Sequence, residues 1–155
     1  MKIPEMDECQ KWSTASFRVS GDLLDPEKVG ERLGLEATVM GSKGEPKSLR
    51  NKNMWRNKSL WRSSIWLLKC PLSNKLPVDD HLKWLLDRLE PKQDEVFSLA
   101  QQFRIDFFCG FSSGNGQGGF TLDSILLARL AKLGIPLILD LYPPETELDI
   151  EPQTA

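Results

Sequence analysis

The chain has 155 residues, of which 40% are hydrophobic and 27% charged, and its formal net charge at pH 7 is −2. A chain of this size and composition is typical of one globular domain that buries a core without disulfide or metal support. A net charge this close to zero excludes a whole-chain attraction to nucleic acid or to anionic membranes.

The cysteines and the hydropathy of the chain predict a protein of a reducing compartment that does not span a membrane. Cys9, Cys70 and Cys109 form an odd, widely spaced set without a CxxC pair, which argues against a zinc site and against a secreted disulfide framework. The first residues lack the apolar core of a signal peptide, and no apolar run approaches the length of a bilayer span. We therefore expect a cytoplasmic protein with no membrane partner, no metal and no cofactor.

The chain begins with a polar lead-in over residues 1–12, which precedes the first predicted strand and helix. Residues 15–20 alternate apolar and polar side chains, as a half-buried strand does. Asp25 offers a side-chain oxygen to free helix amides, and Pro26 has the φ of a first helical residue. The predicted helix ends before Gly34.

The middle of the chain predicts a long loop, a strand and a long helical segment. Residues 40–62 have no clean period and are rich in Lys, Arg and Asn, so we expect a loop there. Residues 64–70 read as a strand that Pro71 closes. Residues 79–103 carry leucines at helical spacing, and Pro91 predicts a kink or a second helix.

The last third predicts a strand, a helix and a final strand. Residues 105–111 alternate again, and a glycine-rich loop follows them. The next helix covers residues 122–133 with Gly134 beyond its end, and residues 137–142 form the last strand. Residues 144–155 are acidic, and we expect them to be a disordered tail.

The order of these elements predicts one α+β domain over residues 13–143. It contains a four-stranded sheet with helices packed on one face. The segments 25–35 and 123–135 resemble each other, since each contains a helix closed by Leu-Gly. This echo suggests two strand-helix-strand halves, and a ferredoxin-like arrangement is compatible with it.

Several short segments occur in an order and spacing that resemble a known family. They are Phe17-Arg-Val-Ser-Gly-Asp22, Asp25-Pro26 with Leu33-Gly34-Leu35, the Trp61 and Trp66 pair, His81-Leu-x-Trp-Leu-Leu-x-x-Leu-Glu-Pro91, Gly119-Phe-Thr-Leu-Asp123 and Leu130-Ala-x-Leu-Gly-Ile-Pro-Leu-x-Leu-Asp-Leu-Tyr142. Over residues 14–143 the chain resembles the bacterial domain of unknown function family 4279. The resemblance implies a small cytosolic domain without an established activity, and it implies no catalytic residues.

Residues 114–119 contain Gly-x-Gly-x-x-Gly, which is the spacing of a dinucleotide-binding loop. A predicted strand precedes it, a predicted helix follows it, and Asp140 lies where the ribose-binding acid is expected. However, Phe120 and Thr121 separate the last glycine from the helix, and the serine, glycine and asparagine content suits a plain turn. We therefore expect no nucleotide cofactor.

Few residues could carry catalysis. His81 is the only histidine, and a Cys–His pair with Cys70 or Cys109 stays open because such partners meet in space. Both cysteines fall at apolar strand positions, where a thiol behaves as a small hydrophobe. Asp106 and Asp140 on neighbouring strands could do acid–base chemistry, but solvent-facing positions explain them equally well. We expect no catalytic residues, with a small enzyme of unknown reaction as a further alternative.

The most informative region is residues 43–66, where cations and tryptophans are interleaved. The region contains Lys43, Lys47, Arg50, Lys52, Arg56, Lys58 and Arg62, with Glu45 as the only acid and with Trp55, Trp61 and Trp66. Trp66 and Trp61 suit the core, which leaves Trp55 for binding. The predicted binding surface is Arg50, Lys52, Trp55, Arg56, Lys58 and Arg62.

This composition favours a binding function. Trp and Arg are the preferred anchors of protein interfaces, and a basic loop complements an acidic partner. We predict a non-catalytic protein-interaction module, such as an immunity or regulatory binding protein. Binding of single-stranded nucleic acid through residues 43–66 is the alternative, because cations neutralise phosphates and aromatic rings stack on bases. The sequence leaves the oligomeric state open.

Overall fold

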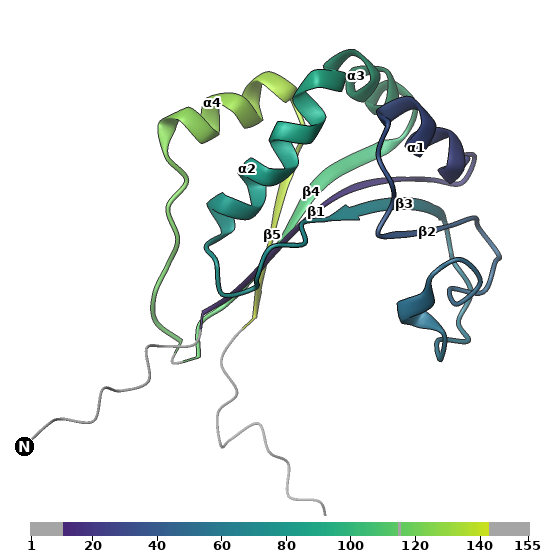
Figure 1. Cartoon of the computed structure of the whole chain (residues 1–155), viewed down its shortest axis with the longest axis horizontal. Coiled ribbons are helices and arrows are strands. Elements are labelled where there is room, and N and C mark those ends of the chain that lie inside the picture. The colour runs from purple at the N-terminus through teal and green to yellow at the C-terminus, as the bar shows by residue number, and fades with distance from the viewer. Residues whose placement is uncertain (1–10, 115, 143–155) are drawn as a thin grey trace, which may run out of the picture.

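The fold is organised around a sheet that carries its helices on one face (Figure 1). The computed structural model describes residues 11–114 and 116–142. In chain order the elements are β1 (Trp12–Gly21), α1 (Pro26–Leu33), β2 (Val39–Gly41), the 3-10 turn η1 (Lys52–Met54), β3 (Ser64–Lys69), α2 (Val78–Leu89), the 3-10 turn η2 (Glu90–Lys92), α3 (Gln93–Gln102), β4 (Arg104–Ser112), α4 (Ser124–Leu133) and β5 (Leu137–Tyr142).

Five strands form one mixed sheet in the order β2-β3-β1-β4-β5. The central strand β1 pairs antiparallel with β3 and β4, and β2 pairs antiparallel with β3. β5 runs parallel to β4, and α4 connects the two. The α+β domain predicted from the sequence is confirmed, but the sheet has five strands rather than four. The additional strand is β2, whose three residues are too few to show an alternating pattern in the sequence.

The first helix has the bounds that the sequence predicted, and the last helix ends before Gly134 as predicted but begins at Ser124, two residues later than predicted. The Asp25 carboxylate accepts a hydrogen bond from a first-turn amide at 3.2 Å, and the Asp123 carboxylate accepts one at 2.8 Å. Gly34 and Gly134 close these helices in the left-handed conformation, with φ of 66° and 69°. Near Pro91 the long helical segment divides into α2 and α3, as the proline predicted.

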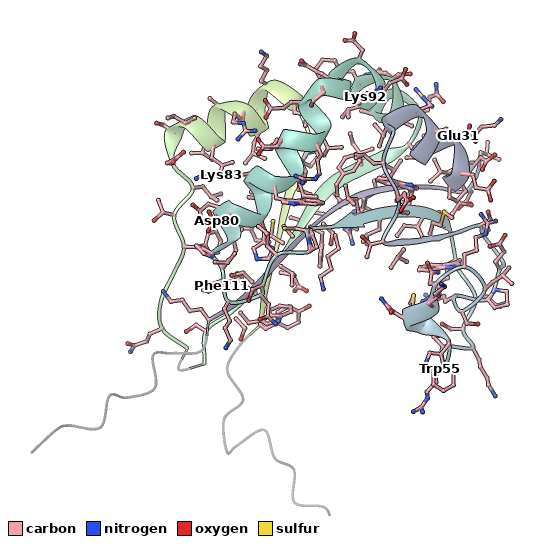
Figure 2. The ribbon with its side chains drawn as sticks, viewed as in Figure 1. Glu31, Trp55, Asp80, Lys83, Lys92 and Phe111 are labelled. Atoms are coloured by element: carbon pink, nitrogen blue, oxygen red, sulfur yellow. The ribbon has the colours of Figure 1, made fainter. Side chains whose placement is uncertain are left out.

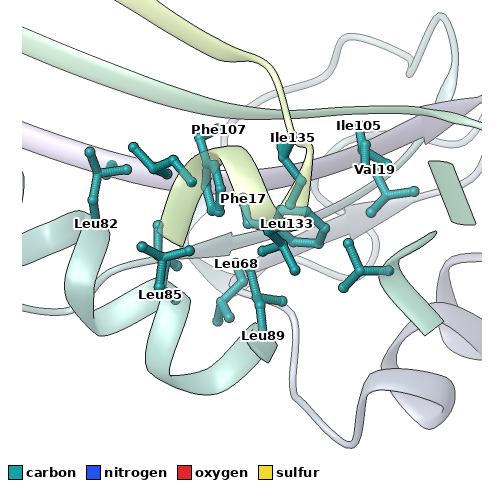
Figure 3. Packing of buried hydrophobic residues seen from close by; sticks show 14 of the residues in the cluster. Phe17, Val19, Leu68, Leu82, Leu85, Leu89, Ile105, Phe107, Leu133 and Ile135 are labelled. Carbon is teal, nitrogen blue, oxygen red and sulfur yellow. The ribbon is translucent and has the colours of Figure 1, made fainter. Parts of the chain in front are cut away.

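The core lies between the sheet and the helices (Figure 3). The fully buried ring of Phe17 lies 6.2 Å from Trp66 on β3 and 5.8 Å from Phe107 on β4, measured between ring centroids. Helix α2 packs on this layer with four fully buried leucines, Leu82, Leu85, Leu86 and Leu89. Burying one such side chain contributes about 1.5–3 kcal/mol, so the contact between α2 and the sheet is a main source of stability.

The β2–β3 loop (residues 42–63) is anchored to the sheet by Trp61, which lies against Gly41. A Cβ atom on Gly41 would lie 2.0 Å from Nε1 of the Trp61 indole, which is closer than real contacts allow. The Lys47 ammonium lies 4.9 Å from the centroid of the same ring, within range of a cation–π interaction. Only glycine at position 41 therefore lets the indole lie on β2.

We predict that Gly41→Ala lowers the free energy of unfolding by about 1–3 kcal/mol, the usual cost of forcing an extra methyl group into a packed site. Urea unfolding followed by circular dichroism measures this change. Gly119→Ala is the matched control, because no heavy atom lies within 4 Å of a Cβ atom at Gly119. Equal stability of the two variants would show that Trp61 does not depend on Gly41.

Candidate functional site

The β2–β3 loop is ordered by hydrogen bonds within the loop itself. Its two arms pair through backbone hydrogen bonds: the Gly44 amide donates to the Trp61 carbonyl at 2.8 Å, and the Trp61 amide donates to the Glu45 carbonyl at 2.9 Å. The Lys47 amide then donates to the Ser59 carbonyl at 2.9 Å. The loop therefore has a fixed base from which its tip projects.

Asn51 joins the tip of this loop to the outer edge of β2. Its carboxamide oxygen accepts from the Met40 amide at 2.9 Å, and its nitrogen donates to the Met40 carbonyl at 2.8 Å. The same nitrogen donates to the Lys47 carbonyl at 2.8 Å, and Asn51 is only 5% exposed. The amide thus satisfies the strand edge as a neighbouring backbone would, and the loop is held by a buried contact.

Two of the loop's cations are held by acids. Arg50 donates to Glu45 at 2.6 Å and lies 3.5 Å from Glu27 on α1, and Lys43 donates to Asp22 at 2.8 Å. The hydrogen bond from Arg50 lowers the pKa of Glu45 below its ordinary value. Arg50 therefore braces the loop against α1, although the sequence analysis assigned it to the binding surface.

Trp55 projects from the tip of the loop, on the side of the molecule away from the helices (Figure 2). It is 66% exposed, and the guanidinium carbon of Arg56 lies 4.4 Å from a ring centroid of its indole. Lys52, Lys58 and Arg62 are exposed, and within the described ranges none of them forms an ion pair. Of the six residues predicted for the binding surface, the structure brings Trp55 and Arg56 into contact, and it leaves Lys52, Lys58 and Arg62 exposed elsewhere on the same loop.

Of the other two tryptophans, both expected in the core, only Trp66 belongs to it, and Trp61 packs against β2 instead. Trp66 is 1% exposed and belongs to the core, as predicted. Trp61 lies on β2 and is half-buried. The β2–β3 loop therefore offers one aromatic ring to a partner, and not a series of them.

On the helix-free face of the sheet, Arg18 and Asp106 pair across β1 and β4. Arg18 Nε donates to Oδ1 of Asp106 at 2.7 Å, and Nη2 donates to Oδ2 at 3.0 Å. The guanidinium also lies 4.2 Å from the ring centroid of Phe108. Asp140 lies opposite Gly110, further along β4, so the two aspartates do not face each other in the sheet. Both carboxylate oxygens of Asp106 accept hydrogen bonds from Arg18, which argues against acid–base chemistry by Asp106 and Asp140 as a pair.

The candidate cysteine–histidine pair does not form among the described residues. His81 is 1% exposed, and its Nε2 lies 3.1 Å from the Ser73 carbonyl, which accepts the ring proton in that arrangement. No hydrogen bond joins it to Cys70 or Cys109, both of which are free thiols buried in the core. Burial raises the pKa of Cys70, and it raises that of Cys109 to about 12. Cys9 lies outside the described residues.

A pocket of about 350 Å³ lies where the start of β1 meets the end of β3. Its lining consists of Trp12, Thr14, Thr38, Lys69, Cys70, Pro71, Leu72 and Asn74. None of these is a His, Asp or Glu, and burial raises the pKa of Cys70, so among the lining residues the side chains that most often act as general acid or base are missing.

The glycine loop does not meet the N-terminus of α4. Gly116 and Gly118 have φ of 73° and 109°, and the Gly116 amide donates to the Ser113 carbonyl at 3.1 Å, as in a turn. A long connection then leads to α4, which begins only at Ser124 (Figure 1). A dinucleotide site needs the glycine turn to open directly into the helix, because the helix amides bind the pyrophosphate.

The residues that fix the loop were missed in the sequence. Asn51 acts through Met40 on β2, and Gly41 is the β2 residue on which Trp61 lies. The strand β2 was itself not predicted. A mixed loop composition carries no signal for such contacts, since one buried amide and one missing side chain look like ordinary loop residues.

We predict that NAD, NADP and ATP do not raise the melting temperature at millimolar concentration. A site with a micromolar Kd would add about 4 kcal/mol at a thousandfold excess of ligand, which thermal shift would detect easily. A clear rise with any of the three ligands would contradict the interpretation of residues 114–119 as a turn.

We also predict that Cys70 and Cys109 react slowly with iodoacetamide at neutral pH, since their raised pKa values leave little thiolate. Peptide mapping by mass spectrometry separates these two sites from Cys9. Protein unfolded in guanidinium is the control and should be alkylated rapidly at all three cysteines. Rapid modification of either buried thiol in folded protein would revive a cysteine mechanism.

Comparison with known proteins gives the chain a family and nothing more specific. Within the described residues, no helix is both long and apolar enough to cross a membrane, and no group of three or more His, Cys, Asp or Glu could hold a metal ion. Neither a curated protein nor a solved structure matches the chain. A family model does match, over residues 8–144, and the chain belongs to that family, described as Domain of unknown function (DUF4279).

Proposed function

We propose that this protein is a non-catalytic interaction module that binds another protein through its β2–β3 loop. The observation that carries the proposal is Trp55, which is 66% exposed at the tip of a braced loop. Covering the ring in a partner's pocket would contribute about 25 cal/mol for each Å² of apolar surface removed from water. Arg56, stacked on the ring, is the second anchor, because Trp and Arg dominate binding energy at interfaces.

The bracing of the loop supports this function energetically. The contacts of Asn51 with β2 and of Arg50 with Glu45 and Glu27 hold the loop before any partner arrives. A loop that is already ordered loses less conformational entropy on binding, so more of the contact energy becomes affinity. Flexible basic loops lack this advantage.

The exposed charges of the β2–β3 loop indicate the chemistry of the partner. Lys52, Arg56, Lys58 and Arg62 are exposed, and among the described residues no acid pairs with them. Uncompensated cations around an aromatic anchor speed association with an acidic surface and disfavour basic ones. We therefore propose an acidic protein partner.

Single-stranded nucleic acid is the second candidate, because the same cations could neutralise phosphates. Such sites stack successive bases on several aromatic rings, and this loop offers only Trp55. Trp61 lies against Gly41, Trp66 is in the core, and Arg56 already lies over the Trp55 ring. These contacts favour protein over nucleic acid.

We propose further that the protein works in a bacterial cytosol, as an immunity or regulatory binding protein. Its two described thiols, Cys70 and Cys109, are unpaired and buried, which suits a reducing compartment. We also infer that β1–β4 follow a ferredoxin-like arrangement, to which α4 and β5 are added. The antiparallel order β2-β3-β1-β4 supports this inference, with α1 connecting β1 to β2 and α2–α3 connecting β3 to β4.

We predict that Trp55→Ala or Arg56→Ala weakens the partner complex by about 2 kcal/mol, or roughly 30-fold in Kd. The partner is first identified by pull-down with wild-type protein and mass spectrometry, and each Kd is then measured by calorimetry. Leu23→Ala is the control, since Leu23 is 93% exposed and lies outside the loop. Equal Kd values for Trp55→Ala and wild type would remove Trp55 from the interface.

The two candidate partners are separated by salt and by a charge variant. We predict that wild-type protein binds single-stranded oligonucleotides weakly and loses them near physiological salt, since a few phosphate contacts depend steeply on salt. The variant changes Lys52, Arg56, Lys58 and Arg62 to Ala and spares Arg50, so that the loop stays braced. Submicromolar oligonucleotide binding at physiological salt, lost in this variant, would establish the nucleic-acid function instead.

A further inference from the structure

The two edge strands of the sheet differ in whether other residues cover their backbone groups. At the β2 edge the strand has only three residues, and the Asn51 amide occupies both backbone groups of Met40. Short strands and covered backbone groups are the usual protection of a sheet edge against pairing with another chain. At the β5 edge, no described segment pairs with the side of the strand that faces away from β4.

The free edge of β5 presents the backbone groups of its three leucines. In the parallel pairing with β4, the Phe107 amide donates to the Pro136 carbonyl at 2.8 Å, and Phe107 lies opposite Leu137. In such a ladder, alternate residues direct both backbone groups to the same neighbour. The even-numbered residues of β5 therefore face β4, and the N–H and C=O groups of Leu137, Leu139 and Leu141 face outward.

Two of these leucines, Leu139 and Leu141, also lie beyond the cover of the helices, whereas Leu137 packs against the core. Leu139 is opposite Cys109 and Leu141 is opposite Phe111, so their side chains lie on the helix side of the sheet. Leu139 is nevertheless 45% exposed and Leu141 is 63% exposed. An uncovered strand that combines free backbone groups with exposed leucines is a surface for adding another strand.

We propose that β5 pairs antiparallel with β5 of a second copy of this chain, which joins two sheets into one across a twofold axis. In the assigned register Leu139 lies opposite Leu139 of the second copy, and Leu137 lies opposite Leu141. These leucine pairs are the hydrogen-bonded pairs of the ladder, because the backbone N–H and C=O groups of all three leucines face outward. The same pairing removes the exposed leucines from water.

The single charge on β5 disfavours one of the two neighbouring registers, and the spacing of the leucines disfavours the other. If Leu139 lay opposite Leu141 instead, Asp140 would face Asp140 of the second copy, and like charges directly opposite each other are destabilising. In the assigned register Asp140 lies opposite Ile138, so no like charges meet. In the other neighbouring register Leu137 would lie opposite Leu139, and Leu141 would have no leucine opposite it. The assigned register alone pairs every leucine and keeps like charges apart, and this self-complementarity favours a second copy as the occupant.

The experiment measures self-association of the full-length chain by sedimentation velocity, from about 1 μM to about 1 mM, the range of weak dimers. We expect wild-type protein to pass from monomer to dimer as concentration rises. Leu139→Lys places two ammonium groups opposite each other and should raise the dimer Kd by roughly tenfold or more. Leu23→Lys is the control, because Leu23 is 93% exposed and lies in the turn after β1.

A charge exchange tests the register itself. Leu139→Lys and Leu139→Glu should each be monomeric, and an equimolar mixture should form a heterodimer, since position 139 faces position 139. Circular dichroism and melting curves establish that both variants are folded. Wild-type protein that stays monomeric at every concentration would overturn the proposal, as would folded charge variants that dimerise like wild type. A mixture that fails to associate would overturn the assigned register.

Discussion

Helices cover only one face of the sheet, and the burial of β1 beneath them determines what the remaining surfaces can do. Because Phe17 and Val19 face the helices, Arg18 between them faces the uncovered side. There its bidentate pairing satisfies Asp106, which is 4% exposed, and its guanidinium stacks on Phe108. A carboxylate buried without such a partner would be costly. The centre of the uncovered face is thus occupied by groups that satisfy one another.

Acidic residues divide the cations of the β2–β3 loop into two groups. Arg50 and Lys43 have acidic partners at hydrogen-bond distance, and these contacts join the loop to itself and to neighbouring elements. Lys52, Lys58 and Arg62 have no acid within reach among the described residues. The composition of the loop is therefore misleading when taken as a whole, because part of its charge is structural and only the rest is available to a partner.

The sequence predicted the features that depend on neighbouring residues. Asp25 and Gly34 act within one or two turns of their own helix, and the alternation around Phe17 needs only the strand itself. Contacts between distant segments were not predictable in this way. Neither the role of Asn51, which pairs with a strand eleven residues away, nor that of Arg50, which reaches α1, leaves a local pattern.

The same limit explains why the strand edges could not be assigned from the sequence. Residues 137–142 were predicted as a strand, but whether a strand is central or at an edge depends on the order of all five. Leu139 and Leu141 look like core residues in the sequence, because apolar alternation does not report whether a helix lies above them. Their exposure follows from the position of β5 at the end of the sheet.

The two proposed surfaces lie at opposite edges of the sheet, and this separation has a consequence for binding. The β2–β3 loop leaves from the β2 edge, whereas self-pairing would use the β5 edge. A dimer joined at β5 would therefore keep both Trp55 tips free and far apart. A partner with two copies of the binding epitope at a matching distance could then bind both tips at once. The second binding event would be intramolecular, so the overall affinity would rise although each interface stays the same. A partner with one epitope would gain nothing from the dimer, so valency would discriminate between partners of similar surface chemistry.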